Sequence, residues 1–126
     1  MALIARNVDT GAVVADKVIV AATRADRAVG LLAHQSLPPG EGLWIIPSRG
    51  IHTCWMRFAI DIVALDAHGV VIDQVAALKP WRIRLPRRGG VGVLELPAGT
   101  LSATGTTLGH RIELRPMENG NGSPNR

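Results

Sequence analysis

The apolar residues of this chain fall into short runs that Gly and Pro interrupt, and this punctuation narrows the possible folds most strongly. Aromatic residues make up only 3% of the chain and Tyr is absent, so the core must consist mainly of Val, Ile, Leu and Ala. Short runs of branched aliphatic residues between turn residues favour strands over helices. The sequence therefore predicts a mainly β protein.

Several runs have the length and composition of strands, and one segment has the spacing of a helix. The helix is predicted to begin after Thr23, a suitable N-cap, and to end before Pro38. Segment 51–65 could form two strands or one bent strand. These elements predict a single small β-barrel or sandwich-like domain of about nine short strands with one α-helix. The predicted strands are 2–8, 13–22, 42–46, 51–56, 59–65, 70–78, 81–85, 91–96 and 110–114.

The length of 126 residues fits one domain, and 47% hydrophobic with 19% charged residues is an ordinary globular balance. The ordered domain is predicted to span 1–116. The remaining segment, 117–126, is rich in Gly, Asn, Ser and Pro, so it is predicted to be a disordered tail.

The net charge of +4 and the pI near 10.6 permit weak attraction to nucleic acid or anionic lipid but establish neither. The single cysteine, Cys54, cannot form an intramolecular disulfide, so nothing implies an oxidising compartment. Asp9 and Gly11 interrupt the N-terminal apolar run too early for a signal peptide or a membrane helix. The expected location is therefore the cytoplasm, with no membrane association.

Asp61 and Glu95 stand inside otherwise apolar strands, where a carboxylate is costly unless it is paired or hydrogen-bonded. Both faces of 60–65 are apolar, so this strand is predicted to be central and covered on both sides. In the structural interpretation, Asp61 accepts backbone N–H groups of a nearby loop and Glu95 pairs with an Arg. In the functional interpretation, the two carboxylates line one pocket and present charge to a ligand.

His52 and Cys54 are two residues apart in a predicted strand, so their side chains would share a face at roughly 7 Å. That separation is too long for a Cys–His nucleophile and base. It would suit two ligands of one metal ion, with His110, Asp61 or Glu95 supplying another, but no CxxC or HExxH motif supports this. No Gly-rich segment leads into a helix as a phosphate loop does. Cys54 is therefore interpreted as a small hydrophobe, and no metal or cofactor is predicted.

The segment 79–88 carries five cations and no acid. Apolar and basic residues alternate from Trp81 to Leu85, which predicts an amphipathic edge strand with a basic outer face. In the alternative, the cations follow a nucleic-acid backbone while Trp81 stacks on a base. Arg49 and Arg57 could neutralise a buried carboxylate or bind an anionic ligand, although solvent exposure is the commoner outcome.

Short motifs in a fixed order extend over about residues 28–115. They are 30–32, 40–45, 52–53, 56–58, 60–66, 78–82, 93–99 and 109–112. With these motifs the chain resembles the family called domain of unknown function number 192, also named uncharacterised protein family 0127. The resemblance implies a compact, mostly β domain with one helix and no established activity. It supports His52, Asp61 and Glu95 as pocket residues, whereas Cys54 departs from the family pattern.

The principal functional hypothesis is a small β domain with a ligand-binding cleft for a small molecule or a peptide. Its pocket residues would be His52, Trp55, Arg57, Asp61, Trp81 and Glu95. The first alternative is a hydrolase in which His52 works with Asp61 or Glu95 as acid–base partners. The second is nucleic-acid binding through 79–88. The pattern indicates no oligomeric state.

Overall fold

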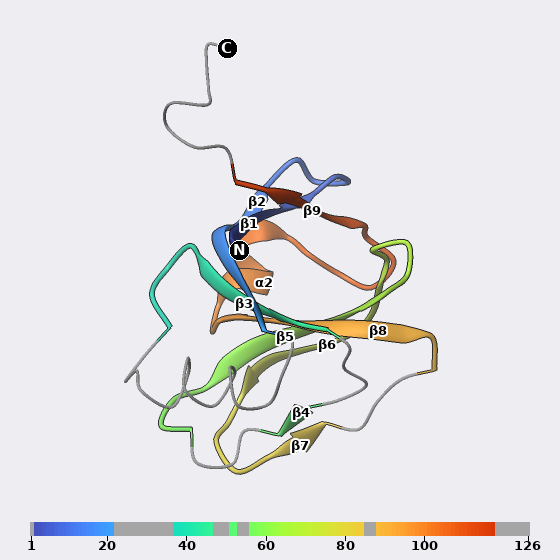
Figure 1. Cartoon of the computed structure of the whole chain (residues 1–126). Helices are drawn as coiled ribbons and strands as arrows, with labels where there is room; N and C mark the ends of the chain where they lie inside the picture. The colour runs from blue at the N-terminus through green and yellow to red at the C-terminus, as the bar shows by residue number, and fades with distance from the viewer. Residues whose placement is uncertain (1, 22–36, 47–50, 53–55, 85–87, 118–126) are drawn as a thin grey trace.

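A computed structural model describes residues 2–21, 37–46, 51–52, 56–84 and 88–117 (Figure 1). Within these residues the chain forms nine strands and one short helix, so the mainly β prediction is confirmed. The predicted helix after Thr23 and the predicted tail lie outside the described residues, apart from Leu37 and Met117. The elements are β1 (Ala2–Asn7), β2 (Val13–Ala21), β3 (Glu41–Ile45), β4 (Ile51–His52), β5 (Ile60–Asp66), β6 (Val71–Leu78), β7 (Ile83–Arg84), β8 (Gly90–Pro97), α2 (Thr100–Thr104) and β9 (Ile112–Pro116).

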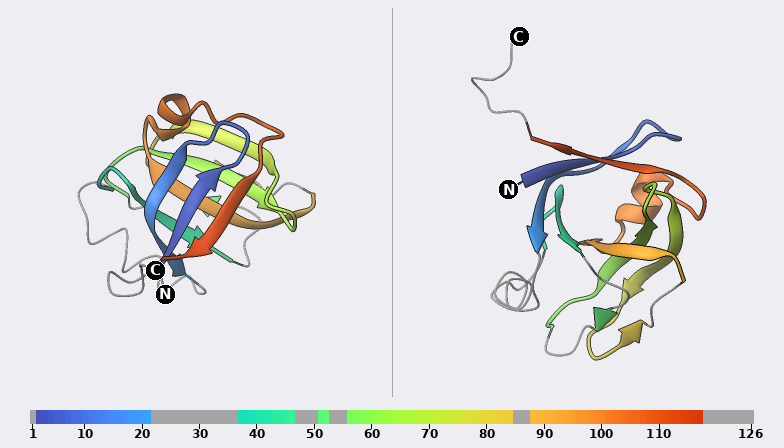
Figure 2. Two further views of the ribbon diagram at one scale, coloured as in Figure 1. Left: turned by 90° about the horizontal axis from the view of Figure 1, so that it is seen from above. Right: turned by 45° about the vertical axis from the view of Figure 1, so that its right-hand side comes forward.

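Seven of the strands form one curled sheet in the order β6-β5-β8-β3-β2-β1-β9. All neighbouring strands in it are antiparallel except β2 and β3, which run parallel. The other two strands, β4 and β7, pair with each other and form a separate ribbon. Figures 1 and 2 show this ribbon at the end of the molecule remote from β1 and β9. The architecture is therefore a curled sheet with a small second layer.

The curl brings the two edge strands of the sheet together at one end. The backbone N–H of Ile112 donates to the carbonyl of Gly69 at 2.8 Å, and that of Val71 donates to the carbonyl of His110 at 2.8 Å. Gly69 has a φ of +82°, and a Cβ there would lie 2.6 Å from the Ile112 carbonyl oxygen. Glycine is required at this closure because no other residue leaves room for the opposite strand.

A buried amide fixes the loops around this closure. The Oδ1 atom of Asn7 accepts the backbone N–H groups of Asp9 and Thr10, at 2.9 and 3.1 Å. These donors identify the other end of the amide as Nδ2, which donates to Thr106 Oγ1 and lies 3.1 Å from His110 Nδ1. That nitrogen of His110 must therefore be an acceptor, so the imidazole carries its proton on Nε2.

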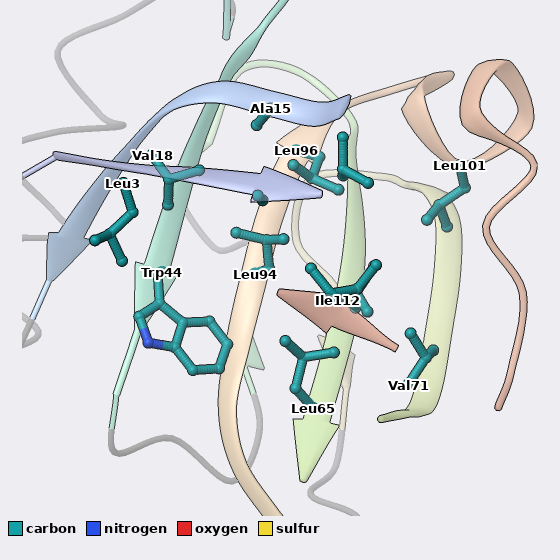
Figure 3. Packing of buried hydrophobic residues seen from close by; sticks show 13 residues of the cluster. Leu3, Ala15, Val18, Trp44, Leu65, Val71, Leu94, Leu96, Leu101 and Ile112 are labelled. Atoms are coloured by element: carbon teal, nitrogen blue, oxygen red, sulfur yellow. The ribbon is translucent and has the colours of Figure 1, made fainter. Parts of the chain in front are cut away.

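The interior strands β5 and β8 are buried on both faces, as the two apolar faces of 60–65 predict for β5. We call the concave side face 1, and Figure 3 shows its core around Trp44, Leu94, Leu96 and Ile112. The opposite side, face 2, holds a second core that includes Leu43, Ile45, Met56, Ile60, Ile62 and Val93. Gly92 lies beneath the Trp44 indole. A Cβ at this position would lie 2.4 Å from the ring, so the glycine leaves the space that the indole occupies. The pleat thus separates two cores across one sheet.

Two local predictions are wrong. Only Ile83 and Arg84 of the predicted strand 81–85 are in a strand among its described residues, and the side chains of Trp81 and Ile83 are exposed rather than buried. Trp81 has a φ of +62°, in a turn that Pro80 precedes. No Gly-rich segment was expected to lead into a helix, but Gly99 is the N-cap residue of α2. Long-range contacts determine the conformation of both segments, and a local sequence pattern does not encode such contacts.

Asp66 ends β5 and closes the hairpin to β6, as its position before His68-Gly69 predicts. Its Oδ1 atom accepts the backbone N–H of Val70 at 2.9 Å and that of His68 at 2.8 Å. These bonds, that from Val70 above all, favour the charged carboxylate and lower the pKa of Asp66 below its ordinary value of 3.8.

We expect Asp66 to stabilise the fold in a pH-dependent way. Because its pKa is lower in the folded chain, its contribution is complete above the unfolded pKa and is lost as the pH falls through the folded pKa. The variant Asp66→Asn keeps an oxygen acceptor but cannot titrate. Urea unfolding from pH 7 down to pH 3 should show the stability advantage of the wild type over this variant shrinking below about pH 4. A constant difference would contradict the assignment.

Candidate functional site

Asp61 is fully buried on face 1, and backbone donors occupy both of its carboxylate oxygens. Its Oδ1 accepts the N–H of Ala77 at 2.7 Å, and its Oδ2 accepts those of Leu101 at 2.8 Å and Gly99 at 3.1 Å. Leu101 belongs to the first turn of α2, whose own N-cap residue, Gly99, provides no side-chain cap. Asp61 therefore caps a helix 40 residues away. The structural interpretation accounts for this residue.

Glu95 is also fully buried, but it lies on face 2. Its neighbours across the sheet are Leu43 of β3 and Ile62 of β5, both members of the face 2 core. Leu94 and Leu96, on either side of it in β8, belong to the face 1 core. The carboxylate of Glu95 is thus carried by β8, an interior strand of the sheet, and its cross-strand neighbours are apolar.

The two carboxylates that the sequence suggested for one pocket lie on opposite sides of the sheet. In the β5–β8 register, Asp61 is opposite Leu96 and Glu95 is opposite Ile62. Cross-strand partners point to the same face, and successive residues point to opposite faces. One cleft lined by both carboxylates is therefore not formed. Of the hydrolase pairings, the His52–Asp61 pairing loses its support because Asp61 is fully engaged by backbone donors.

Asp73 joins Glu95 on face 2, and sequence reasoning missed it. It lies opposite Ala64 in the β5–β6 register and is almost completely buried. Arg84 of β7 forms a bidentate pair with it, Nε to Oδ2 at 2.9 Å and Nη2 to Oδ1 at 2.7 Å. This hydrogen-bonded pairing raises the pKa of the Arg84 guanidinium above its ordinary value. The signal was available, because Asp73 is an acid inside an apolar strand in the same way as Asp61 and Glu95.

The ion pair places the β4–β7 ribbon over face 2. Arg84 belongs to the ribbon and Asp73 to the sheet, so the pair joins the two layers. The backbone of His52 pairs with Ile83, directly beside Arg84. Face 2 therefore combines an apolar core, two buried carboxylates, a guanidinium and the ribbon strand that contains His52.

The remaining predicted pocket residues are either exposed or have side chains outside the described part of the chain. Arg57 and Trp81 are exposed. Trp55 and Cys54 lie outside the described residues, and only the backbone of His52 is described. Where side chains are described, no three His, Cys, Asp or Glu groups gather as a metal site requires. The metal alternative, which the sequence did not favour, depended on Cys54 and the side chain of His52, and both lie outside the description.

The protein is a small domain built on one curled sheet. The face of this sheet beneath the two-stranded ribbon carries two buried carboxylates and a guanidinium. The chain belongs to the DUF192 family, described as an uncharacterized ACR, whose model matches residues 5–114. This confirms the family resemblance seen in the sequence, and the family has no established reaction.

Two similar proteins are named only as UPF0127 proteins, and this name states no function. A UPF0127 protein of Pyrococcus furiosus is 34% identical over 70 residues, which are 56% of this chain and only 60% of the relative. A UPF0127 protein of Pyrococcus abyssi is 32% identical over 103 residues, covering 77% of this chain and 85% of the relative.

Two solved structures share the fold. A protein of unknown function from Novosphingobium aromaticivorans aligns with a TM-score of 0.74 at 20% identity, covering 90% of this chain and 84% of that one. A protein from Sinorhizobium meliloti, named a candidate transcription regulator, aligns with a TM-score of 0.73 at 20% identity, covering 90% and 92%. At this identity the likeness concerns the fold alone. None of the helices in the described part of the chain is long and apolar enough to cross a membrane.

We expect substitution of Asp61 to act on stability. Asp61→Ala removes the acceptor of three backbone N–H groups, of which that of Leu101 is buried, so it should lower the free energy of unfolding by roughly 3–5 kcal/mol. Amide hydrogen exchange should quicken first at Ala77, Gly99 and Leu101, the residues whose N–H groups it holds. A fully stable variant with unchanged exchange at these amides would refute the capping role.

Proposed function

We propose that this protein is a ligand-binding domain whose site lies on face 2, beneath the β4–β7 ribbon. The ligand is a small molecule or short peptide that carries an amino group or a similar N–H donor, and Glu95 accepts from it. The observation that supports this proposal most directly is the fully buried carboxylate of Glu95 in β8, an interior strand of the sheet. Burying a carboxylate costs several kcal/mol in desolvation, and ionisable groups kept in buried places are typical of binding sites.

The position of Glu95 supports its choice among the buried carboxylates. Asp61 lies on the opposite face of the sheet, where it caps α2, and Asp73 anchors the ribbon through Arg84. Glu95 lies on the same face as Asp73, two strands away, because β5 separates β6 from β8. Face 2 thus holds a second carboxylate beside the Asp73–Arg84 pair, and the proposal places the amino group of the ligand against it.

The ribbon completes the proposed site. Arg84 anchors β7 over face 2 through a bidentate pair that fixes the side chain in direction as well as position. Its partner strand, β4, brings the backbone of His52 to this layer. A ligand bound between the sheet and the ribbon would be largely removed from water, and a buried charged hydrogen bond is strongest in such surroundings.

We expect Glu95→Gln to weaken recognition of amino ligands. Thermal-shift and native mass-spectrometry measurements would use lysine, putrescine, dialanine and diglycine as probes. A probe that binds the wild type should bind the variant about 10- to 100-fold more weakly, since a charged hydrogen bond is lost.

The matched control is Glu113→Gln on β9, where Glu113 pairs with Arg115 far from face 2. This variant should bind like the wild type. If no amine or peptide probe binds the wild type, or if both variants respond equally, the face 2 site is wrong.

We also propose that the protein acts in the cytoplasm. A single cysteine in the chain supports a compartment in which disulfides are not needed. Fractionation of cells that produce the protein should recover it with cytoplasmic markers. Recovery from the periplasm or the culture medium would contradict this location.

A further inference from the structure

Two large apolar side chains are exposed to solvent where β6 leads into β7, Trp81 in the turn and Ile83 in β7 itself. Ile83 is 69% exposed, the highest value for a large hydrophobic residue in the described part of the chain, and Trp81 is 55% exposed. Single exposed hydrophobics are common, but two that are two residues apart on one projecting segment form a patch that needs an explanation. The segment projects at the end of the molecule remote from β1 and β9 (Figure 1).

The backbone of Trp81 is held in an unfavourable conformation. Its φ of +62° lies in the left-handed region, which favours Gly and disfavours a bulky side chain. The preceding Pro80 fixes the turn, so the indole is carried at the position where glycine usually stands. Because much of the Trp81 side chain is exposed, burial of the indole offsets little of this backbone strain. Strain of this kind typically persists where the side chain serves a function.

Basic residues surround this apolar pair. Lys79 and Arg82 flank Trp81 and are exposed, and no acid occurs in the sequence from 74 to 94. Arg57 is also exposed. Arg84 is turned toward Asp73, whereas Lys79 and Arg82 are exposed beside the apolar pair in the sequence.

We propose that Trp81, Ile83, Lys79 and Arg82 form a docking surface for an anionic lipid bilayer. Trp is suited to the membrane interface, where its ring lies among the headgroups, and Ile83 can enter the acyl region beside it. The cations bind acidic headgroups around the inserted pair. Nucleic acid is less well matched, because stacking surfaces use several aromatic rings. Among Trp44, Phe58 and Trp81, the aromatic residues described, only Trp81 is exposed.

Vesicle cosedimentation of the full chain tests this surface. Vesicles would contain phosphatidylcholine alone or phosphatidylcholine mixed with phosphatidylglycerol. We expect binding to the mixed vesicles only, weakened about fivefold by Lys79→Gln or Arg82→Gln, because each basic residue contributes about 1 kcal/mol at an anionic surface. Ile83→Ser should also weaken it. Two control variants, Ile19→Ser on β2 and Arg115→Gln on β9, each remove an exposed side chain outside this surface. Both should bind like the wild type.

Trp81→Gly separates docking from folding. Glycine relieves the left-handed strain, so the thermal midpoint should equal or exceed that of the wild type while vesicle binding is lost. Absent vesicle binding by the wild type would overturn the proposal, as would binding that Trp81→Gly leaves intact. If the wild type instead binds a single-stranded oligonucleotide through Trp81 and ignores vesicles, the surface serves nucleic acid and the lipid assignment is wrong.

Discussion

The hydrogen bonds of Asp61 hold together parts of the chain that are distant in sequence. One carboxylate of β5 accepts N–H groups from the end of β6 and from the start of α2. The connection from β8 to β9 is therefore fixed against the sheet through a residue of a third strand. Because the donors are backbone groups, the carboxylate sets the path of the chain, and the cores can pack only around that path.

The alternation of side chains in β5 and β8 then divides the molecule chemically. Odd and even residues of these strands enter different cores, so each buried acid can serve only the face to which its position assigns it. Face 1 uses its acid to build the fold. Face 2 holds Glu95 and the Asp73–Arg84 pair beneath the ribbon, which is why we place the ligand there. The structural and the proposed functional chemistry are thus separated by one sheet.

Much of the fold could be predicted from the sequence, because apolar runs between turn residues report strands directly. The central position of 60–65 followed from its two apolar faces, and the turn at Asp66 followed from its local residues. The location of Asp61 and Glu95 on opposite faces of the sheet could not be predicted. It depends on the β5–β8 register, where a shift of one residue would have put both acids on one face.

The segment around Trp81 shows a second limit of sequence reasoning. Alternation of apolar and basic residues predicted a strand with its apolar side inward, and the structure shows the reverse. Arg84 turns inward because Asp73 offers a bidentate partner, and the positive φ of Trp81 removes that residue from the strand. A long-range ion pair outweighed the local pattern here. The membrane surface we propose exists only because of that inversion.

The division of the acids between two faces can be measured directly. In a methyl-labelled NOESY spectrum, side-chain protons of Glu95 should contact the methyl groups of Leu43 and Ile62, its partners across the sheet. Those of Asp61 should contact the methyl groups of Leu96 and Leu101 instead. Cross-peaks that join both acids to one methyl group would place them on a common face and contradict the account.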